Sequence, residues 1–247
     1  MSDDAVRTLL KEAPLSFLGT VERLRAATMG DVPIDEHTAI VHVDQVLRAP
    51  EAFAQLAGTR ITVQLNAKED APEMGEQFAF FASGSAFGDS LAVDEVGRLP
   101  VSQVEPQLAT AASTGSAPFA ELQAQIEAEG LRAHVDEAAA VVVGRVTGLT
   151  KVTGPPTREH DPDWWVATIE VHHVEKGRLR GEEIEVLYAN SLDVRWRYAP
   201  KPKAAQDGMW ILHATSGALK KVARFQIEHP EDYQPVQHLE ALRTNGG

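Results

Sequence analysis

Short segments in which apolar and polar residues alternate dominate the chain. Residues 38–49 (TAIVHVDQVLRA) and 166–177 (VATIEVHHVEKG) place an apolar side chain at almost every second position, which is typical of half-buried β-strands. Shorter apolar runs bounded by glycine predict the remaining strands. The predicted strands fall into two groups of five, within residues 14–100 and 138–228.

The two groups are copies of one pattern. Residues 14–24 (PLSFLGTVERL) and 138–149 (AAAVVVGRVTGL) share an apolar run followed by glycine, valine and leucine at the same spacing, so that Gly19 matches Gly144. Later strands match in the same order. The expected pairs include Ala39 with Ala167, Val41 with Ile169, Val43 with Val171, Val46 with Val174, Arg48 with Lys176, Ile61 with Ile184, Val63 with Val186 and Gly75 with Gly208. An ordered series of this length predicts an internal duplication.

Five short strands with a long connection between the third and the fourth predict a small Greek-key barrel of the oligonucleotide/oligosaccharide-binding (OB) type. We therefore expect a mainly β fold of two tandem five-stranded OB-like barrels with flanking helices. The helices are predicted at residues 2–13, 101–112, 118–138 with a break at Gly130, and 235–244. The expected domains are residues 1–112, a linker with helices at 113–137 that begins with STGSA (113–117), and residues 138–247.

The second copy resembles a known family. AAAVVVGRV (138–146), ATIEVHHVEKG (167–177), EIEVLYA (183–189) and GMWILHA (208–214) are similar to bacterial barrels related to the netrin-like and TIMP-like domains. That resemblance implies an OB-like barrel, most clearly over residues 138–228. It implies no protease inhibition, because the inhibitory relatives depend on an N-terminal cysteine and disulfides and this chain has no cysteine.

Charge is divided unevenly along the chain. Residues 1–137 hold 9 Lys and Arg against 22 Asp and Glu, whereas residues 138–247 hold 14 of each kind. An acidic first half repels phosphate, so we expect any contact with nucleic acid to involve the second domain only. The chain has no apolar run long enough to span a membrane and no signal-peptide pattern at its start, so we expect a cytoplasmic bacterial protein without membrane contact.

Basic and aromatic residues gather in residues 193–203 (DVRWRYAPKPK). Trp, Tyr and Arg dominate protein–protein hot spots, and the same mixture suits single-stranded nucleic acid. Alternatively, Trp196 caps the barrel and its charged neighbours lie in solvent. Together with two tryptophans before the second strand of the copy, the predicted binding residues are Trp164, Trp165, Arg195, Trp196, Arg197 and Tyr198.

A weaker candidate is a metal site at REHDPDWW (158–165) and the strand that follows. Imidazole and carboxylate groups are suitable ligands for divalent ions. The candidate ligands are His160, Asp161, Asp163 and His172. Neighbouring strand residues point to opposite faces, so at most one of His172 and His173 faces such a site, and exposed histidines beside a polar loop would give the same pattern.

No catalytic motif is present. The chain has no G-x-S-x-G elbow, Walker-type loop, G-x-G-x-x-G turn or H-E-x-x-H helix, and the serine of GSAFG (84–88) has no neighbouring histidine, which predicts a turn. We expect a non-catalytic binding or scaffolding protein that works in a larger assembly, with another protein as partner and no cofactor. The alternatives are a module for single-stranded nucleic acid that uses the second barrel, and a metal-dependent enzyme centred on His160, Asp161 and His172.

Overall fold

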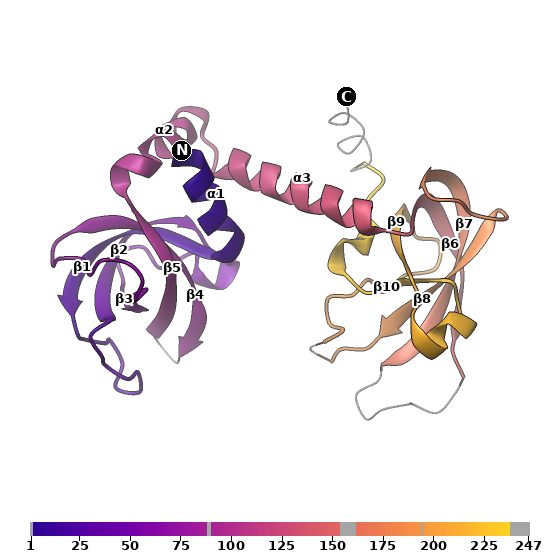
Figure 1. Cartoon of the computed structure of the whole chain (residues 1–247), viewed down its shortest axis with the longest axis horizontal. Helices are drawn as coiled ribbons and strands as arrows, with labels where there is room; N and C mark the ends of the chain where they lie inside the picture. The colour runs from indigo at the N-terminus through magenta and orange to yellow at the C-terminus, as the bar shows by residue number, and fades with distance from the viewer. Residues whose placement is uncertain (1, 88–89, 154–161, 194, 238–247) are drawn as a thin grey trace. The chain divides into compact units, whose positions relative to one another are not determined.

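The chain forms two β-barrels. The computed structural model describes residues 2–87, 90–153, 162–193 and 195–237, which are the coloured segments of Figure 1. Contacts divide the chain into two compact units, Met1–Glu127 and Ala128–Gly247, each with one five-stranded barrel. The predicted fold class, mainly β with two tandem OB-like barrels and flanking helices, is confirmed. Within the described ranges no helix is long and apolar enough to cross a membrane.

The first unit is a helix followed by a barrel and a second helix. Its elements are α1 (Ser2–Glu12), β1 (Leu15–Leu24), β2 (Thr38–Arg48), η1 (Glu51–Phe53), β3 (Arg60–Gln64), β4 (Gln77–Phe87), β5 (Ser90–Pro100) and α2 (Val101–Thr114). The barrel closes in the order β1-β2-β3-β5-β4, with β3 and β5 parallel and the other neighbours antiparallel. Because β4 extends to Phe87, most of residues 84–88 is strand and not the predicted turn.

The second unit repeats this strand order. It contains β6 (Ala140–Lys151), β7 (Asp163–Lys176), β8 (Glu183–Asn190), β9 (Asp207–Ala214), η2 (Gly217–Lys221), β10 (Phe225–Ile227), η3 (Pro230–Asp232) and β11 (Tyr233–Gln234). The sheet runs β10-β8-β7-β6-β9, and pairing of β10 with β9 closes it. As in the first barrel, the third and fifth strands are parallel. Trp210 fills the interior, where its indole N–H donates to the carbonyl oxygen of Gly144 at 3.2 Å.

The strand registers support the duplication in detail. Gly19 lies opposite Val43, and Gly144 lies opposite Val171. The other predicted matches between the first two strands occupy corresponding register positions in the same way. Moreover, β1 and β2 shift register at three places, and β6 and β7 shift at the three matching places. Irregularities at identical positions are a detailed signature of one ancestral hairpin.

One predicted match, Gly75 with Gly208, is wrong. Gly208 lies opposite Gly144, whereas the residue opposite Gly19 is Phe78, three positions beyond Gly75. The two positions require glycine for different reasons. Gly75 adopts a left-handed backbone with φ of 87°, while a β-carbon at Gly208 would lie 2.9 Å from a ring carbon of Tyr233. Glycine at similar places in two sequences therefore does not mark one structural position.

Helix α3 (Ala120–Glu137) is continuous through Gly130, so the predicted break is wrong. An interior glycine costs about 1 kcal/mol relative to alanine, which the surrounding helix-forming residues tolerate. The first part of α3 belongs to the first unit and the last part to the second. Residues 113 and 114 of the predicted linker form the end of α2, and the predicted helix at 235–244 lies largely outside the described residues.

A helix packs on the outside of each barrel in the same way. In the first unit Val6, Leu10 and Ala13 pack with Leu18, Ala79 and Phe81, and in the second Leu131, Val135 and Ala138 pack with Val143, Met209 and Ile211. A cation from the second strand caps each helix. Arg48 donates to the Leu10 carbonyl and Lys176 to the Val135 carbonyl, both at 2.8 Å. The repeating unit is therefore a helix plus a barrel.

Candidate functional site

Trp164 and Trp196 contact one another on the second barrel. Their ring centroids lie 5.5 Å apart at an interplanar angle of 71°, an edge-to-face arrangement. Trp164 belongs to β7. Trp196 belongs to the segment between β8 and β9, where its backbone N–H donates to the Asp193 carbonyl at 2.9 Å. The structure thus brings together two aromatic groups that are more than 30 residues apart in the sequence.

Two arginines stack on neighbouring rings. The guanidinium carbon of Arg195 lies 5.2 Å from the Trp196 ring centre, and that of Arg197 lies 5.4 Å from the Tyr198 ring centre. Both arginines are exposed, and Tyr198 is 69% exposed. A cation over a ring face is attracted by the ring, and an exposed guanidinium group keeps N–H groups available to a ligand. We call Trp164, Arg195, Trp196, Arg197 and Tyr198 the aromatic–arginine surface.

Internal hydrogen bonds hold the segment that carries this surface. The Lys201 ammonium donates to the carbonyls of Trp196 and Ala199, each at 3.0 Å, and the Asp193 carboxylate accepts the backbone N–H of Arg195 at 3.0 Å. Trp196 is half-buried, and its indole nitrogen is enclosed without a hydrogen-bond partner among the described residues. Trp196 therefore covers part of the barrel while its neighbours face solvent.

Trp165 does not join the aromatic–arginine surface. Both Trp164 and Trp165 are residues of β7, and not of a loop as predicted, so their side chains point to opposite faces. Trp165 lies directly across from Tyr188 on β8, with ring centroids 6.5 Å apart, and it packs against the barrel core. Of the six predicted binding residues, this one is held by the barrel itself.

The structure describes two of the four predicted metal ligands, Asp163 and His172, and does not bring these two together. His160 and Asp161 lie outside the described residues. Asp163 forms an ion pair with Lys151 at 2.9 Å, while exposed His172 lies 3.9 Å from the Glu170 carboxylate. Asp163 and His172 are nine residues apart along β7, a separation on the order of 30 Å. These two side chains therefore cannot share an ion.

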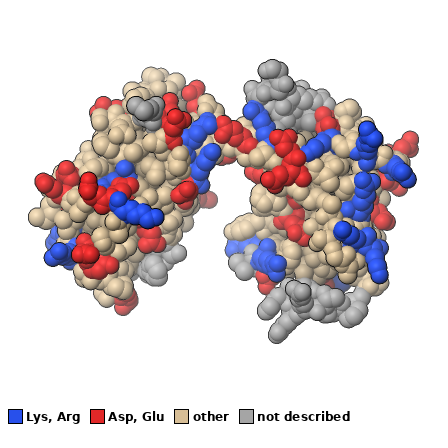
Figure 2. All heavy atoms as spheres, in the orientation of Figure 1, with Lys and Arg blue, Asp and Glu red and all other residues tan. Residues whose placement is uncertain are grey.

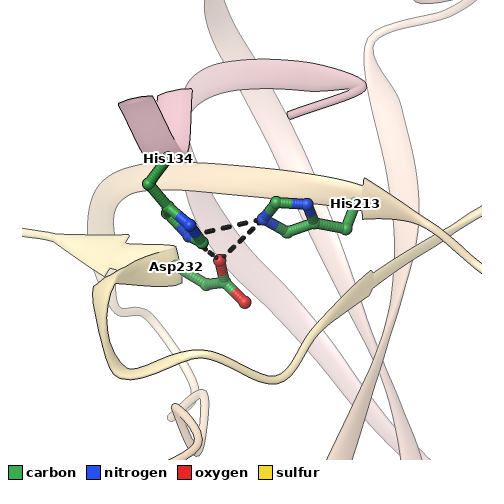
Figure 3. Close-up of side chains that lie close together, drawn as sticks. All are labelled: His134, His213 and Asp232. Carbon is green, nitrogen blue, oxygen red and sulfur yellow. Dashed lines mark hydrogen bonds and ion pairs between the residues drawn. The ribbon is translucent and has the colours of Figure 1, made fainter. Parts of the chain in front are cut away.

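A different histidine cluster lies in the second unit. His134 comes from α3, His213 from β9 and Asp232 from η3, and Figure 3 shows their side chains turned toward one another. The His134 Nε2 lies 2.6 Å, and the His213 Nε2 3.1 Å, from Oδ1 of Asp232. The two Nε2 atoms are 3.3 Å apart. We call these three residues the His–His–Asp cluster.

A second carboxylate lies beside the one in this cluster. Asp232 is fully buried, whereas Glu228 is exposed and its backbone N–H donates to the Asp232 carboxylate. Partial burial and the charge of Asp232 raise the pKa of Glu228, and the charge of Arg195 lowers it. Sequence analysis did not predict the cluster, because its members are 79 and 19 residues apart along the chain. The only local signal is HPED at 229–232, where the Asp232 carboxylate accepts the His229 N–H as in a capping box.

Comparisons with known proteins assign the chain to no family. No family model matches it, and no curated protein matches it. The coarser part of the resemblance noted in the sequence, two closed five-stranded barrels with OB strand order, is present in the structure. Function must therefore be argued from the sites themselves.

Proposed function

We propose that the protein is a non-catalytic binding protein whose second barrel binds an acidic segment of another protein through the aromatic–arginine surface. The observation that carries the proposal is the pair of exposed guanidinium groups stacked on adjacent rings, Arg195 on Trp196 and Arg197 on Tyr198. A stacked guanidinium offers a fixed fork of N–H donors that matches a carboxylate. Interface energy concentrates in Arg, Trp and Tyr.

The charge of the segment supports an acidic partner. Residues 191–206 contain four cations, Arg195, Arg197, Lys201 and Lys203, and one acid, Asp193. Figure 2 shows Lys and Arg side chains spread over the drawn face of the second unit with Asp and Glu side chains among them, so the excess of cations is a property of this segment. Exposed Leu192 and Tyr198 add apolar area beside the arginines. A ligand with carboxylates next to an apolar side chain matches this combination.

Single-stranded nucleic acid is the alternative ligand, and the charge of the barrel opposes it. OB folds bind oligonucleotides on the face of strands two and three and on the adjoining loops. In the second barrel the exposed face of these strands carries Glu170, Glu183 and Glu185, which repel phosphate. One observation favours the alternative, since the connection between β9 and β10 carries Lys220, Lys221 and Arg224.

The proposal also covers the assembly, the location and the relatives of the protein. A role in a larger assembly, a cytoplasmic location and a relation to the netrin-like and TIMP-like barrels all agree with a tandem-barrel chain that has no cysteine. The alternative of a metal-dependent enzyme centred on His160, Asp161 and His172 draws no support from the described residues, because His160 and Asp161 lie outside them and His172 is nine residues along β7 from Asp163.

Charge reversal with a matched control tests the proposal. Arg195→Glu with Arg197→Glu reverses the two stacked cations. Arg178→Glu with Arg180→Glu makes the same change, at the same spacing, at exposed positions of the same barrel. Full-length wild-type protein and both double variants serve as baits in affinity capture from the native host. We expect proteins with acidic segments that the wild type and the control retain and the first variant loses.

Two results would contradict the proposal. Equal capture by all three baits would remove the aromatic–arginine surface as the binding site. Salt-dependent binding of oligothymidylate by the wild type, lost only in Arg195→Glu with Arg197→Glu, would make nucleic acid the ligand of this surface.

A further inference from the structure

The geometry points to a zinc-binding site formed by the Nε2 atoms of His134 and His213 and the Oδ1 atom of Asp232. Its three ligands are different residues from those of the aromatic–arginine surface. Figure 3 shows the three side chains converging from a helix, a strand and a short 3₁₀ turn within the second unit. Each of the three contributes one donor atom to the same small volume.

The distances match a tetrahedral zinc site after a small adjustment. Ligand atoms about 2.0–2.1 Å from zinc lie about 3.3 Å from one another at tetrahedral angles. The two Nε2 atoms are 3.3 Å apart, and the His213 Nε2 is 3.1 Å from Oδ1 of Asp232. Only the 2.6 Å separation between His134 and Asp232 must widen on binding. His134 lies on the last turns of a helix, where a change of side-chain rotamer supplies this movement.

The Asp232 carboxylate is oriented by the backbone for this role. Its Oδ2 atom accepts the N–H groups of Glu228 at 2.6 Å and His229 at 2.8 Å, which turns Oδ1 toward the two imidazoles. A buried carboxylate requires a compensating positive charge, and the described side chains that face Oδ1 are the two imidazoles. A divalent cation held by Oδ1 and both Nε2 atoms would supply this charge.

The donor set selects the class of ion. Two imidazoles and one carboxylate suit zinc and its neighbours in the first transition series, whereas magnesium and calcium prefer oxygen ligands throughout. Three protein ligands leave a fourth coordination position. His229 and Glu231 lie near His134, and the His229 ring centroid is 4.7 Å from that of His134.

The first barrel shows that the fold does not require these side chains. Leu10 and Val135 both accept the capping cation, so the preceding residues, Leu9 and His134, correspond. Ser83 corresponds to His213, because each pairs with the middle of the fifth strand at matching positions. Strand β5 runs without interruption through the region where η3 places Asp232. The cluster is therefore a feature that only the second barrel carries.

Zinc titration of the full-length chain tests the site. Protein stripped with a chelator is titrated with zinc in competition with a dye of micromolar affinity. We expect one strong site per chain, whose occupancy raises the unfolding midpoint followed by tryptophan fluorescence. His134→Leu with His213→Ser installs the residues of the first barrel, so it should fold and should weaken zinc binding by at least about tenfold. His172→Gln with His173→Gln removes two exposed histidines elsewhere on the barrel and should leave the affinity unchanged.

X-ray absorption and the variants decide whether His134, His213 and Asp232 bind the zinc. X-ray absorption of the loaded wild type should show nitrogen and oxygen neighbours at about 2.0–2.2 Å with imidazole scattering. The site is wrong if the wild type fails to compete with the dye. It is also wrong if His172→Gln with His173→Gln weakens binding as much as the first-barrel replacement, because zinc would then be held by surface histidines. Single variants His134→Gln and His213→Gln, each with an unchanged metal-free unfolding midpoint, separate lost ligation from lost folding.

Discussion

Ala205 occupies in the second barrel the backbone position that Gly75 occupies in the first. The Gly75 N–H donates to the Val21 carbonyl at 2.8 Å, and the Ala205 N–H donates to the corresponding Val146 carbonyl at 2.9 Å. Both residues have positive φ, 87° for Gly75 and 61° for Ala205. The same turn therefore leads into the fourth strand of each barrel, although only one copy has glycine there.

This equivalence predicts opposite effects of exchanging the two residues. A left-handed backbone costs an alanine about 1–2 kcal/mol, partly offset by the greater entropy that glycine loses on folding. Ala205→Gly should therefore raise the free energy of unfolding by about 0.5–1 kcal/mol, and Gly75→Ala should lower it by a similar amount. Urea denaturation followed by circular dichroism measures both. Equal signs for the two exchanges would contradict the assignment.

The helix-capping cations should stabilise the two units separately. Lys176 donates to the carbonyls of Val135 and Asp136, so Lys176→Met should cost about 1–2 kcal/mol. All four tryptophans belong to the second unit, so the urea midpoint of tryptophan fluorescence should fall in this variant. In Arg48→Met that midpoint should stay unchanged while circular dichroism reports a loss. Lys151→Met, which breaks an exposed ion pair with Asp163, is the control and should cost no more than about 0.5 kcal/mol.

Trp196 and Arg197 should differ in their effect on stability. Trp196 is half-buried against Trp164, so Trp196→Ala should lower the free energy of unfolding by about 1–2 kcal/mol, less than a fully buried tryptophan would. Arg197 is exposed, so Arg197→Ala should change it by less than about 0.5 kcal/mol. Circular dichroism in urea measures both. A clear fall in the free energy of unfolding of Arg197→Ala would show that this arginine stabilises the fold and is not held free for a ligand.

Glu95 in the first barrel predicts a pH dependence. Its fully buried side chain accepts hydrogen bonds from Arg98 and from the Asn66 N–H, yet burial raises its pKa above the ordinary 4.5. The folded state therefore holds this proton more tightly than the unfolded state. The stabilisation that protonation gives is complete below about pH 4.5 and is lost as the pH rises through the folded pKa.

The non-titrating variant Glu95→Gln isolates this effect. The difference in free energy of unfolding, wild type minus Glu95→Gln, should fall as the pH rises from 4.5, and should then level off. Urea denaturation followed by circular dichroism at a series of pH values gives the curve. A difference that stays constant or rises with pH would show that Arg98 outweighs burial at this carboxylate.

The hydrophobic periodicity of the sequence predicted the features that depend on residues close together in the chain. Alternation in β2 and β7 gave the strands, and their shared order gave the duplication and the barrel. The match of Gly75 with Gly208 failed because glycine serves both a left-handed turn and a close ring contact. The prediction for Trp165 failed because this residue follows a loop, and its sequence neighbours do not show where the strand begins. Pairing with β8 places it in the strand.

The functional clusters depend on closure of the barrel. Sequence analysis placed Trp164 and Trp196 in one set of binding residues but did not predict that their rings touch. The His–His–Asp cluster joins a helix, a strand and a 3₁₀ turn, and no spacing in the sequence indicates that His134 and Asp232 meet. Such sites are formed by tertiary structure, and they can be found only when the packing of the helix, strand and turn against one another is known.

The most direct test of partner binding is photo-crosslinking from the aromatic–arginine surface. The photoreactive residue p-benzoylphenylalanine replaces exposed Tyr198 in the full-length chain, and replaces exposed His173 on the same barrel as a control. Irradiation in cells of the native host is followed by mapping of the crosslinked peptides. The account predicts crosslinks from position 198, absent from position 173, that fall in acidic segments of another protein. Crosslinks from position 198 that reach only nucleic acid, or that equal those from position 173, would contradict it.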